Sequence, residues 1–159
     1  MARAYVLLTH AEIEAYFEDR AQVKVGRAYD AWQNRQVCSS LLSTVVMYYQ
    51  ARAKAWSVTT ISNQNAEKAR NFYVTELREN HGIKEKNLLS IFLPLGLEHG
   101  DFDASLLATL NSFGLLRGKL AHESIKTHQP IDPKNERDKI QKHILPELRK
   151  LDSKISRLY

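Results

Sequence analysis

Apolar residues recur every three or four positions along most of this chain, which is the spacing that lines one face of an α-helix. The first such series follows Thr9 and Glu12, whose spacing is that of a capping box. We therefore expect the first strong helix to begin near Thr9. Acidic residues lead this segment and basic residues follow, in the order that suits the helix dipole. The apolar series consists of Ile13, Tyr16, Phe17 and Ala21.

Two further apolar stripes predict helices over about residues 35–56 and 65–79. The polar run 57–63 between them is typical of a loop. Gly82 follows the third helix and can adopt the left-handed conformation that ends a helix. The second stripe consists of Leu41, Leu42, Val45, Val46 and Tyr49, and the third of Phe72, Tyr73 and Leu77.

The second half of the chain predicts three more helical segments. Residues 88–97 are strongly apolar but contain Pro94 and Gly96, which favours a short helix followed by a turn. Asp101 or Asp103 is a candidate cap for a helix that runs to about residue 124. After a loop at 126–132, Asp132 and Pro133 mark the start of the last helix. Its stripe consists of Ile140, Ile144, Leu148, Leu151 and Ile155.

No run of alternating apolar and polar residues indicates a β-sheet, so the pattern predicts an all-α bundle of about five helices. The chain has 159 residues, of which 43% are hydrophobic and 26% charged. That length suits one domain over residues 1–159, with enough apolar residues for a core that needs no disulfide.

The N-terminal apolar run is too short for a signal peptide, and no stretch approaches the roughly 20 apolar residues of a membrane span. We therefore expect a cytoplasmic protein with no membrane partner. Cys38 is the only cysteine, so an internal disulfide is impossible. Free cysteines are among the most buried residues, and we expect Cys38 to be buried.

Basic residues exceed acidic ones, with a formal net charge of +5. The stretch from residue 20 to residue 56 contains six basic residues and one acidic residue, Asp30. Trp56 at its end could stack on a base. The last predicted helix is also rich in lysine and arginine. The pattern fits an RNA-binding groove or a face that keeps the protein soluble. The six residues are Arg20, Lys24, Arg27, Arg35, Arg52 and Lys54.

Arg117 and His122 lie in the helix predicted to end near residue 124. Arginine offers a permanent charge and a planar fork that suits phosphate, and histidine exchanges protons near neutral pH. Five steps along a helix separate two side chains by roughly 140° and about 7.5 Å. Gly118 should cost about 1 kcal/mol relative to alanine in a helix interior. Because side chains lean toward the helix N-terminus, the His122 ring lies over Gly118, where room remains for a phosphate, a ribose or a partner helix.

The other polar residues give weaker evidence of a functional site than Arg117 and His122 do. Glu98, His99, Asp101 and Asp103 match no established metal-ligand spacing and are typical of a loop with helix-capping aspartates. A glycine-rich phosphate loop is absent from the sequence. We therefore expect neither a metal nor a cofactor. His10, His81, His128 and His143 are isolated in the sequence, and we expect them at the surface.

The segment 110–124, with four residues between Arg117 and His122, resembles the signature of the HEPN superfamily. Other stretches resemble its RiboL-PSP-HEPN-like branch, and the similarity covers about residues 5–125. These stretches are Leu7-Leu8, Glu14-Ala15-Tyr16-Phe17-Glu18-Asp19, Gly82-Ile83-Lys84 and Leu93-Pro94-Leu95-Gly96.

The resemblance implies a metal-independent endoribonuclease, or an RNA-binding relative, that pairs as a homodimer with two motif copies in one cleft. Arg117 and His122 are then the catalytic residues, with Lys119, Glu123 and Glu14 as candidates for support. Many members carry a polar residue after the arginine, where this chain has Gly118. The resemblance also implies a toxin–antitoxin or phage-defence setting, with an antitoxin or a nucleotidyltransferase as partner.

Two alternatives remain open. The first is a non-catalytic HEPN module that binds RNA, a nucleotide or a partner protein. The second is a helical interaction subunit in which Arg117 lies on the surface and His122 has a capping or interfacial role. Incubation of the purified protein with structured RNA in the presence of a chelator separates the enzyme from both.

Overall fold

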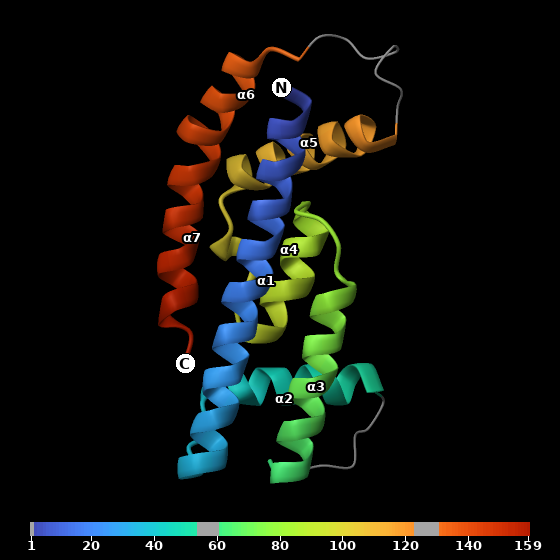
Figure 1. Ribbon diagram of the computed structural model, residues 1–159. Coiled ribbons are helices and arrows are strands. Elements are labelled where there is room, and N and C mark those ends of the chain that lie inside the picture. The colour runs from blue at the N-terminus through green and yellow to red at the C-terminus, as the bar shows by residue number, and fades with distance from the viewer. Residues whose placement is uncertain (1, 54–60, 123–130) are drawn as a thin grey trace.

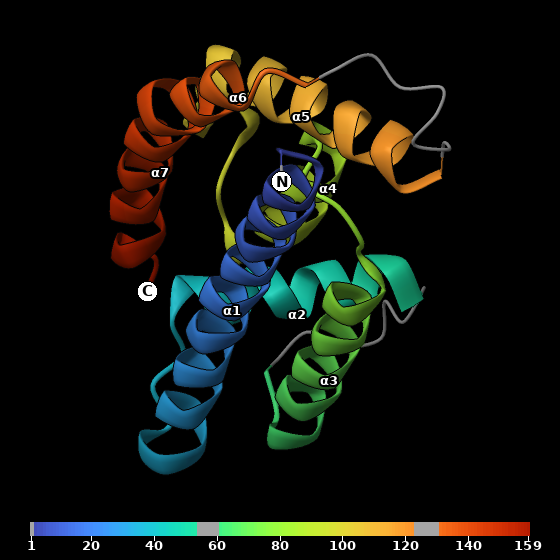
Figure 2. The same ribbon diagram turned by 45° about the horizontal axis from the view of Figure 1, so that its top comes forward.

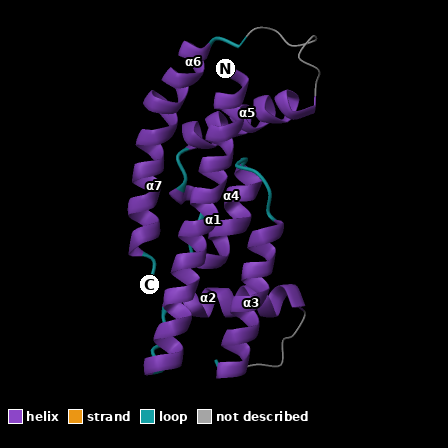
Figure 3. Cartoon of the chain, viewed as in Figure 1, coloured by secondary structure: helices purple, strands orange, loops and turns teal. Residues whose placement is uncertain are grey.

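The computed structural model describes residues 2–53, 61–122 and 131–159 (Figure 1). Regular secondary structure in these ranges is helical throughout (Figure 3), which confirms the all-α prediction. The α-helices are α1 (Ala2–Arg35), α2 (Ser40–Ala53), α3 (Asn63–Glu79), α4 (Glu85–Phe92), α5 (Ala104–His122), α6 (Pro133–Lys139) and α7 (Leu145–Arg157). Short 3-10 turns at Leu93–Leu95 and His99–Asp101 separate α4 from α5.

The helices gather around α1, which is the longest helix described (Figures 1 and 2). Helices α2 and α3 contact its C-terminal half, and α5 crosses its N-terminal end. Helices α6 and α7 follow the side of α1 opposite α3, so that the C-terminus lies beside the C-terminal half of α1. The site described below therefore forms where α5 meets the N-terminal end of α1.

Helix α1 begins at Ala2, so the prediction of a helix start near Thr9 is wrong. Thr9 and Glu12 lie inside the helix and form no capping box. The reason is that Val6 and His10 extend the buried stripe backwards at helical spacing, and their burial against the core holds the first two turns. At the other end α1 reaches Arg35, which moves the start of α2 to Ser40 rather than residue 35.

The core joins aromatic and aliphatic side chains from most of the helices. The Phe17 and Phe92 rings meet edge to face with centroids 5.8 Å apart. Tyr73 is 1% exposed, and its hydroxyl donates a hydrogen bond to the Ile91 carbonyl at 2.7 Å. Tyr73 thereby fastens α3 to α4.

The predicted start and stripe of the last helix are confirmed. The Asp132 carboxylate accepts a hydrogen bond from the Lys134 backbone N–H at 3.0 Å. The helix is interrupted by a π-helical turn at Ile140–Ile144, which the periodicity did not predict. Pro146 follows this turn; a proline ring clashes with the carbonyl four residues earlier, and a wider turn relieves that clash. All five stripe residues, Ile140, Ile144, Leu148, Leu151 and Ile155, are buried.

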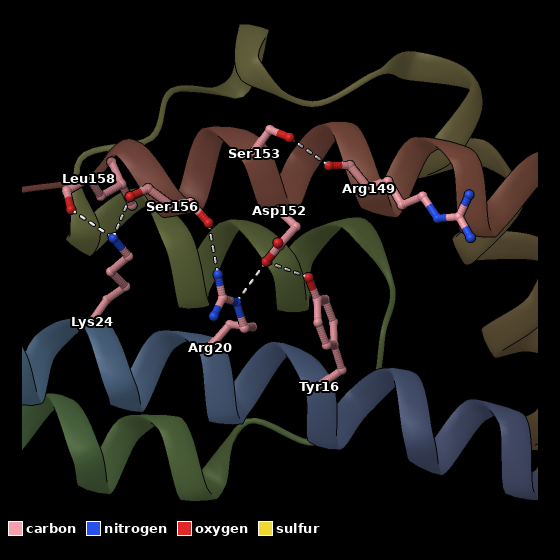
Figure 4. Close-up of polar contacts among 8 residues, drawn as sticks. All are labelled: Tyr16, Arg20, Lys24, Arg149, Asp152, Ser153, Ser156 and Leu158. Carbon is pink, nitrogen blue, oxygen red and sulfur yellow. Dashed lines mark hydrogen bonds and ion pairs between the residues drawn. The ribbon is translucent and has the colours of Figure 1, made fainter.

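Polar contacts hold α7 against α1 (Figure 4). The Asp152 carboxylate accepts a hydrogen bond from the Tyr16 hydroxyl at 2.7 Å and pairs with Arg20 Nε at 2.7 Å. Burial and the hydrogen bond to Asp152 raise the pKa of Tyr16 to about 12. One turn further along α7, the Arg20 guanidinium also donates to Ser156 Oγ at 2.9 Å.

Cys38 is exposed, so the prediction that it is buried is wrong. It lies in the short connection between α1 and α2, where its sulfur is 3.3 Å from Ser43 Oγ. The buried side chain of that connection is the neighbouring Ser39, which is 3% exposed. In the described ranges, no helix is both long enough and apolar enough to span a membrane.

Candidate functional site

Helix α5 carries the arginine–histidine motif because its other side is anchored in the core. Leu110, Phe113 and Leu120 are each at most 1% exposed. The Asn111 side-chain oxygen accepts a hydrogen bond from the Glu85 backbone N–H at 2.9 Å, which caps α4 and fixes it on α5. The helix continues regularly to His122, so the predicted helical position of the motif is confirmed.

Arg117 lines a cleft of about 240 Å³ between α1, α5 and the connection from α3 to α4. Its side chain is half-buried and forms no hydrogen bond or ion pair with the described residues. The guanidinium is therefore available to an anion in the cleft. Five other polar or small residues of the lining are His10, Glu14, His81, Lys84 and Gly118.

Glu14 also lines this cleft and has two partners there. Its carboxylate accepts a hydrogen bond from the Gly82 backbone N–H and lies 3.5 Å from His10 Nδ1. These contacts fix the connection before α4 to the first helix. We expected Glu14 to be a candidate for orienting a motif side chain; it shares the cleft with Arg117 but contacts His10 and Gly82 instead.

His10 is 4% exposed, so its expected surface position is wrong. Its ring stacks on Phe113 with centroids 6.4 Å apart. Burial lowers the pKa of His10, Glu14 opposes that effect, and the charge of Arg117 reinforces it. His10 is therefore a neutral imidazole beside the arginine at physiological pH. Its position four residues before Glu14, and on the same stripe as Val6 and Ile13, is the sequence signal that was missed.

The cleft is rich in positive charge. Lys84, Lys86 and Arg117 line it together with His81, against the single carboxylate of Glu14. A Cβ atom on Gly114 would lie 3.0 Å from Lys84 Cγ, so Gly114 is what lets the lysine stem lie across α5. Sequence reasoning did not find Lys84 and Lys86 as site residues, because they are 30 or more positions from the motif.

His122 is exposed at the end of α5 and does not line the cleft. On a regular helix Leu115, Gly118 and His122 fall within an arc of about 60°. Leu115 is 55% exposed, and a Cβ atom on Gly118 would meet nothing within 4 Å. These three residues, here called the outer face of α5, border the cleft at Gly118.

The structure therefore brings some predicted site residues together and leaves others apart. Arg117, Gly118 and Glu14 share the cleft, whereas Lys119 and His122 are exposed outside it. Glu123 lies outside the described residues. The two residues of the motif thus point to different surroundings within one chain, as the helical spacing predicts.

The acidic cluster at residues 98–103 caps helices, as predicted. The Asp101 carboxylate accepts a hydrogen bond from the Glu98 backbone N–H at 2.9 Å. The Asp103 carboxylate accepts a hydrogen bond from the Leu106 backbone N–H at 3.0 Å. The His99 ring instead pairs with Glu85, with Nε2 3.0 Å from the carboxylate. No group of three or more histidine, cysteine, aspartate or glutamate side chains in the described ranges is placed to hold a metal ion.

The described helices form an all-α bundle that carries Arg117 and His122 on α5, as expected for a HEPN domain. The RiboL-PSP-HEPN family model matches residues 1–155, and this chain belongs to that family. No curated protein and no solved structure matches the chain.

Proposed function

We propose that this protein is a metal-independent endoribonuclease that acts as a symmetric homodimer of one HEPN domain, residues 1–159. The observation that carries the proposal is the unpaired Arg117 in a cleft rich in lysine and histidine. Such a cleft suits the phosphate backbone of RNA, because charge-assisted hydrogen bonds from arginine are strong and geometrically specific. Membership of the RiboL-PSP-HEPN family supports RNA as the ligand.

The second copy supplies what one chain lacks. His122 and the exposed Leu115 share the outer face of α5, which adjoins the cleft at Gly118. A twofold contact between two such faces covers Leu115 and places the His122 of each copy at a shared groove. Lys119, on the same exposed side, and Glu123 then contribute supporting charge.

In this groove the 2′-hydroxyl of RNA attacks the adjacent phosphorus, and the bond to the 5′ oxygen of the next nucleotide breaks. One His122 accepts the proton of the 2′-hydroxyl, and the His122 of the other copy donates a proton to the leaving oxygen. Arg117 stabilises the charge that develops on the phosphoryl oxygens. The products are a 2′,3′-cyclic phosphate and a 5′-hydroxyl. In the cell we expect the cytoplasm and a toxin–antitoxin or phage-defence role, with an antitoxin or nucleotidyltransferase as regulator.

The test is cleavage of structured RNA by the purified protein in the presence of a chelator, with analysis of the product ends. His122→Ala and Arg117→Ala should each lower the rate by about 10²-fold or more. His143→Ala and Arg78→Ala remove the same groups from exposed positions that line no described cavity, and should leave the rate unchanged. Activity that disappears in chelator, or survives in His122→Ala, refutes the mechanism.

The alternative function is a non-catalytic HEPN module that binds RNA, a nucleotide or a partner protein through the same cleft. The observation in its favour is that His122 does not line the cleft of its own chain. Binding of RNA that depends on Arg117, without cleavage at any protein concentration that gives a dimer, identifies this function.

A further inference from the structure

A second and larger cavity, of about 590 Å³, lies away from the Arg117 cleft. It is formed by the C-terminal half of α1, the connection to α2 and the C-terminal end of α7. The two cavities share no lining residue. Figure 1 shows the end of α7 beside the lower half of α1, whereas α5 crosses the upper end. Four basic residues line this cavity, here called the basic pocket: Lys24, Arg27, Arg35 and Arg157.

The positive charge of the basic pocket is largely uncompensated. Arg27, Arg35 and Arg157 are exposed and form no hydrogen bond or ion pair with the described residues. The one acidic side chain among the lining residues is Asp30, which likewise has no partner in the described ranges. Four basic side chains thus line one cavity with a single acidic side chain beside them. Like charges held close together are destabilising unless an anion joins them.

Lys24 shows that the charges act on one another. Its ammonium group donates hydrogen bonds to the carbonyls of Ser156 at 2.7 Å and Leu158 at 3.0 Å (Figure 4). These bonds hold the ammonium group against the end of α7. Burial, followed by the charges of Arg20 and Arg27, lowers the pKa of Lys24. A lysine held by two carbonyls and three exposed arginines without partners in the described ranges are a combination suited to a bound anion.

The floor of the basic pocket distinguishes it from a solvated surface. Ala28, Ala31 and Leu41 line it and are buried, as is Ser39. Ligand cavities commonly have volumes of about 300–1,000 Å³ and combine an apolar lining with a few polar groups. The basic pocket falls in that range, and arginine forks at its rim match the geometry of phosphate oxygens.

We propose that the basic pocket binds a phosphate-rich ligand of nucleotide size, independently of the Arg117 cleft. Phosphate is favoured over a carboxylate ligand because three arginines converge with a lysine, which suits several negative charges on one compact group. The same chemistry is offered by a free nucleoside polyphosphate and by a segment of RNA backbone. The site goes beyond the proposed nuclease activity and does not depend on it.

The experiment measures binding of inorganic tripolyphosphate, ATP and a short single-stranded RNA to the full chain by calorimetry, at 50 and 200 mM salt. The test variant is Arg27→Gln with Arg35→Gln, since both side chains are exposed and unpaired. The matched control is Lys68→Gln with Arg78→Gln on α3, which removes the same charge at exposed positions that line no described cavity. Arg117→Ala separates the two sites.

We expect at least one probe to bind at 50 mM salt and more weakly at 200 mM. The test variant should weaken that binding by about tenfold or more, because two charge-assisted contacts are lost. The control pair should change it by less than about twofold. Arg117→Ala should leave the binding of tripolyphosphate and ATP within the same range, and RNA binding is also measured in Arg117→Ala because the Arg117 cleft is itself proposed to bind RNA. Binding of tripolyphosphate or ATP that the test variant weakens identifies a free polyphosphate ligand. Binding of RNA but of neither other probe identifies the RNA backbone, provided that it persists in Arg117→Ala and is weakened by the test substitutions. Absence of binding by all three probes, or equal weakening in the test and control pairs, overturns the proposal.

Discussion

Replacement of Gly118 by alanine tests whether the open space beside His122 is used. Gly118 lies in the interior of α5 and lines the Arg117 cleft. A Cβ atom built there meets nothing within 4 Å of its own chain. The substitution therefore introduces no clash inside one protomer, and whatever it obstructs must come from outside that protomer.

The expected stability effect follows from the position of Gly118 inside a helix. Alanine in place of glycine in a helix interior stabilises by up to about 1 kcal/mol, through helix propensity and the lower entropy of the unfolded chain. For a chain of this length, 1 kcal/mol corresponds to a rise of about 2–4 °C in Tm. Gly118→Ala should therefore melt a few degrees higher than the unsubstituted protein, provided that the comparison is made on monomers.

Gly26→Ala is the matched control. Gly26 lies in the interior of α1, and an added Cβ atom there also meets nothing within 4 Å. It does not line the Arg117 cleft. Both variants should gain similar stability, but only Gly118→Ala should lose RNA cleavage or dimerisation, because its methyl group intrudes where a phosphate or the second copy of α5 must lie.

Thermal melting, sedimentation and RNA cleavage, measured on both variants, show whether the space beside Gly118 is used. A Gly118→Ala protein that is more stable, dimeric and fully active shows that the space beside Gly118 is unused, and refutes the reasoning about this glycine. The roles of Arg117 and His122 would survive that result, since they rest on their own chemistry and not on the glycine. Loss of stability in Gly118→Ala but not in Gly26→Ala would contradict the open environment of α5.

Three further substitutions test other parts of the structure. Folding lowers the pKa of His10 from 6.5, so the unfolded chain binds more protons than the folded chain just below that pH. The free energy of unfolding should therefore fall as the pH drops from 7.5 to 5, and His10→Gln should flatten this dependence in urea titrations. Tyr73→Phe leaves the buried Ile91 carbonyl without the hydrogen bond from the Tyr73 hydroxyl, and should lower the free energy of unfolding by about 1–3 kcal/mol. An unchanged midpoint of chemical denaturation would contradict the contact. Leu115→Glu should yield a monomer in sedimentation with the fold intact, whereas Met47→Glu, at an exposed apolar position on α2, should not. A Leu115→Glu dimer argues against the outer face of α5 as the interface.

The helices themselves followed from the sequence because their signals are local. The stripe from Ile140 to Ile155 and the cap at Asp132 depend only on spacing within one element, and both are present. The errors arose where a local signal competed with packing. Thr9 looks like a helix start, but burial of Val6 and His10 carries the helix through it. The π-helical turn before Pro146 keeps the stripe buried on both sides of a proline, and no periodicity reveals it.

The site was predictable only in part, for a related reason. Arg117 and His122 stand in one segment, so their types and spacing were visible in the sequence. The cleft, however, is made by three segments that meet only in the fold: α1 near His10, the connection near Lys84, and α5. Nothing in the local sequence of either residue indicates that burial beside Phe113 turns His10 into a neutral neighbour of the arginine.

The separation of Arg117 from His122 is the strongest physical reason to seek function in a dimer. An arginine that faces a cleft without a partner is suited to an anion, but by itself it moves no proton. The buried His10 is held between Phe113 and Glu14, with little freedom to reach a substrate. The exposed His122 has that freedom, and it shares its face with Leu115, which a partner would cover. In the proposed mechanism the acid–base chemistry at the Arg117 cleft comes from the His122 of a second α5, so dilution below the dimer dissociation constant should abolish cleavage in proportion to the loss of dimer.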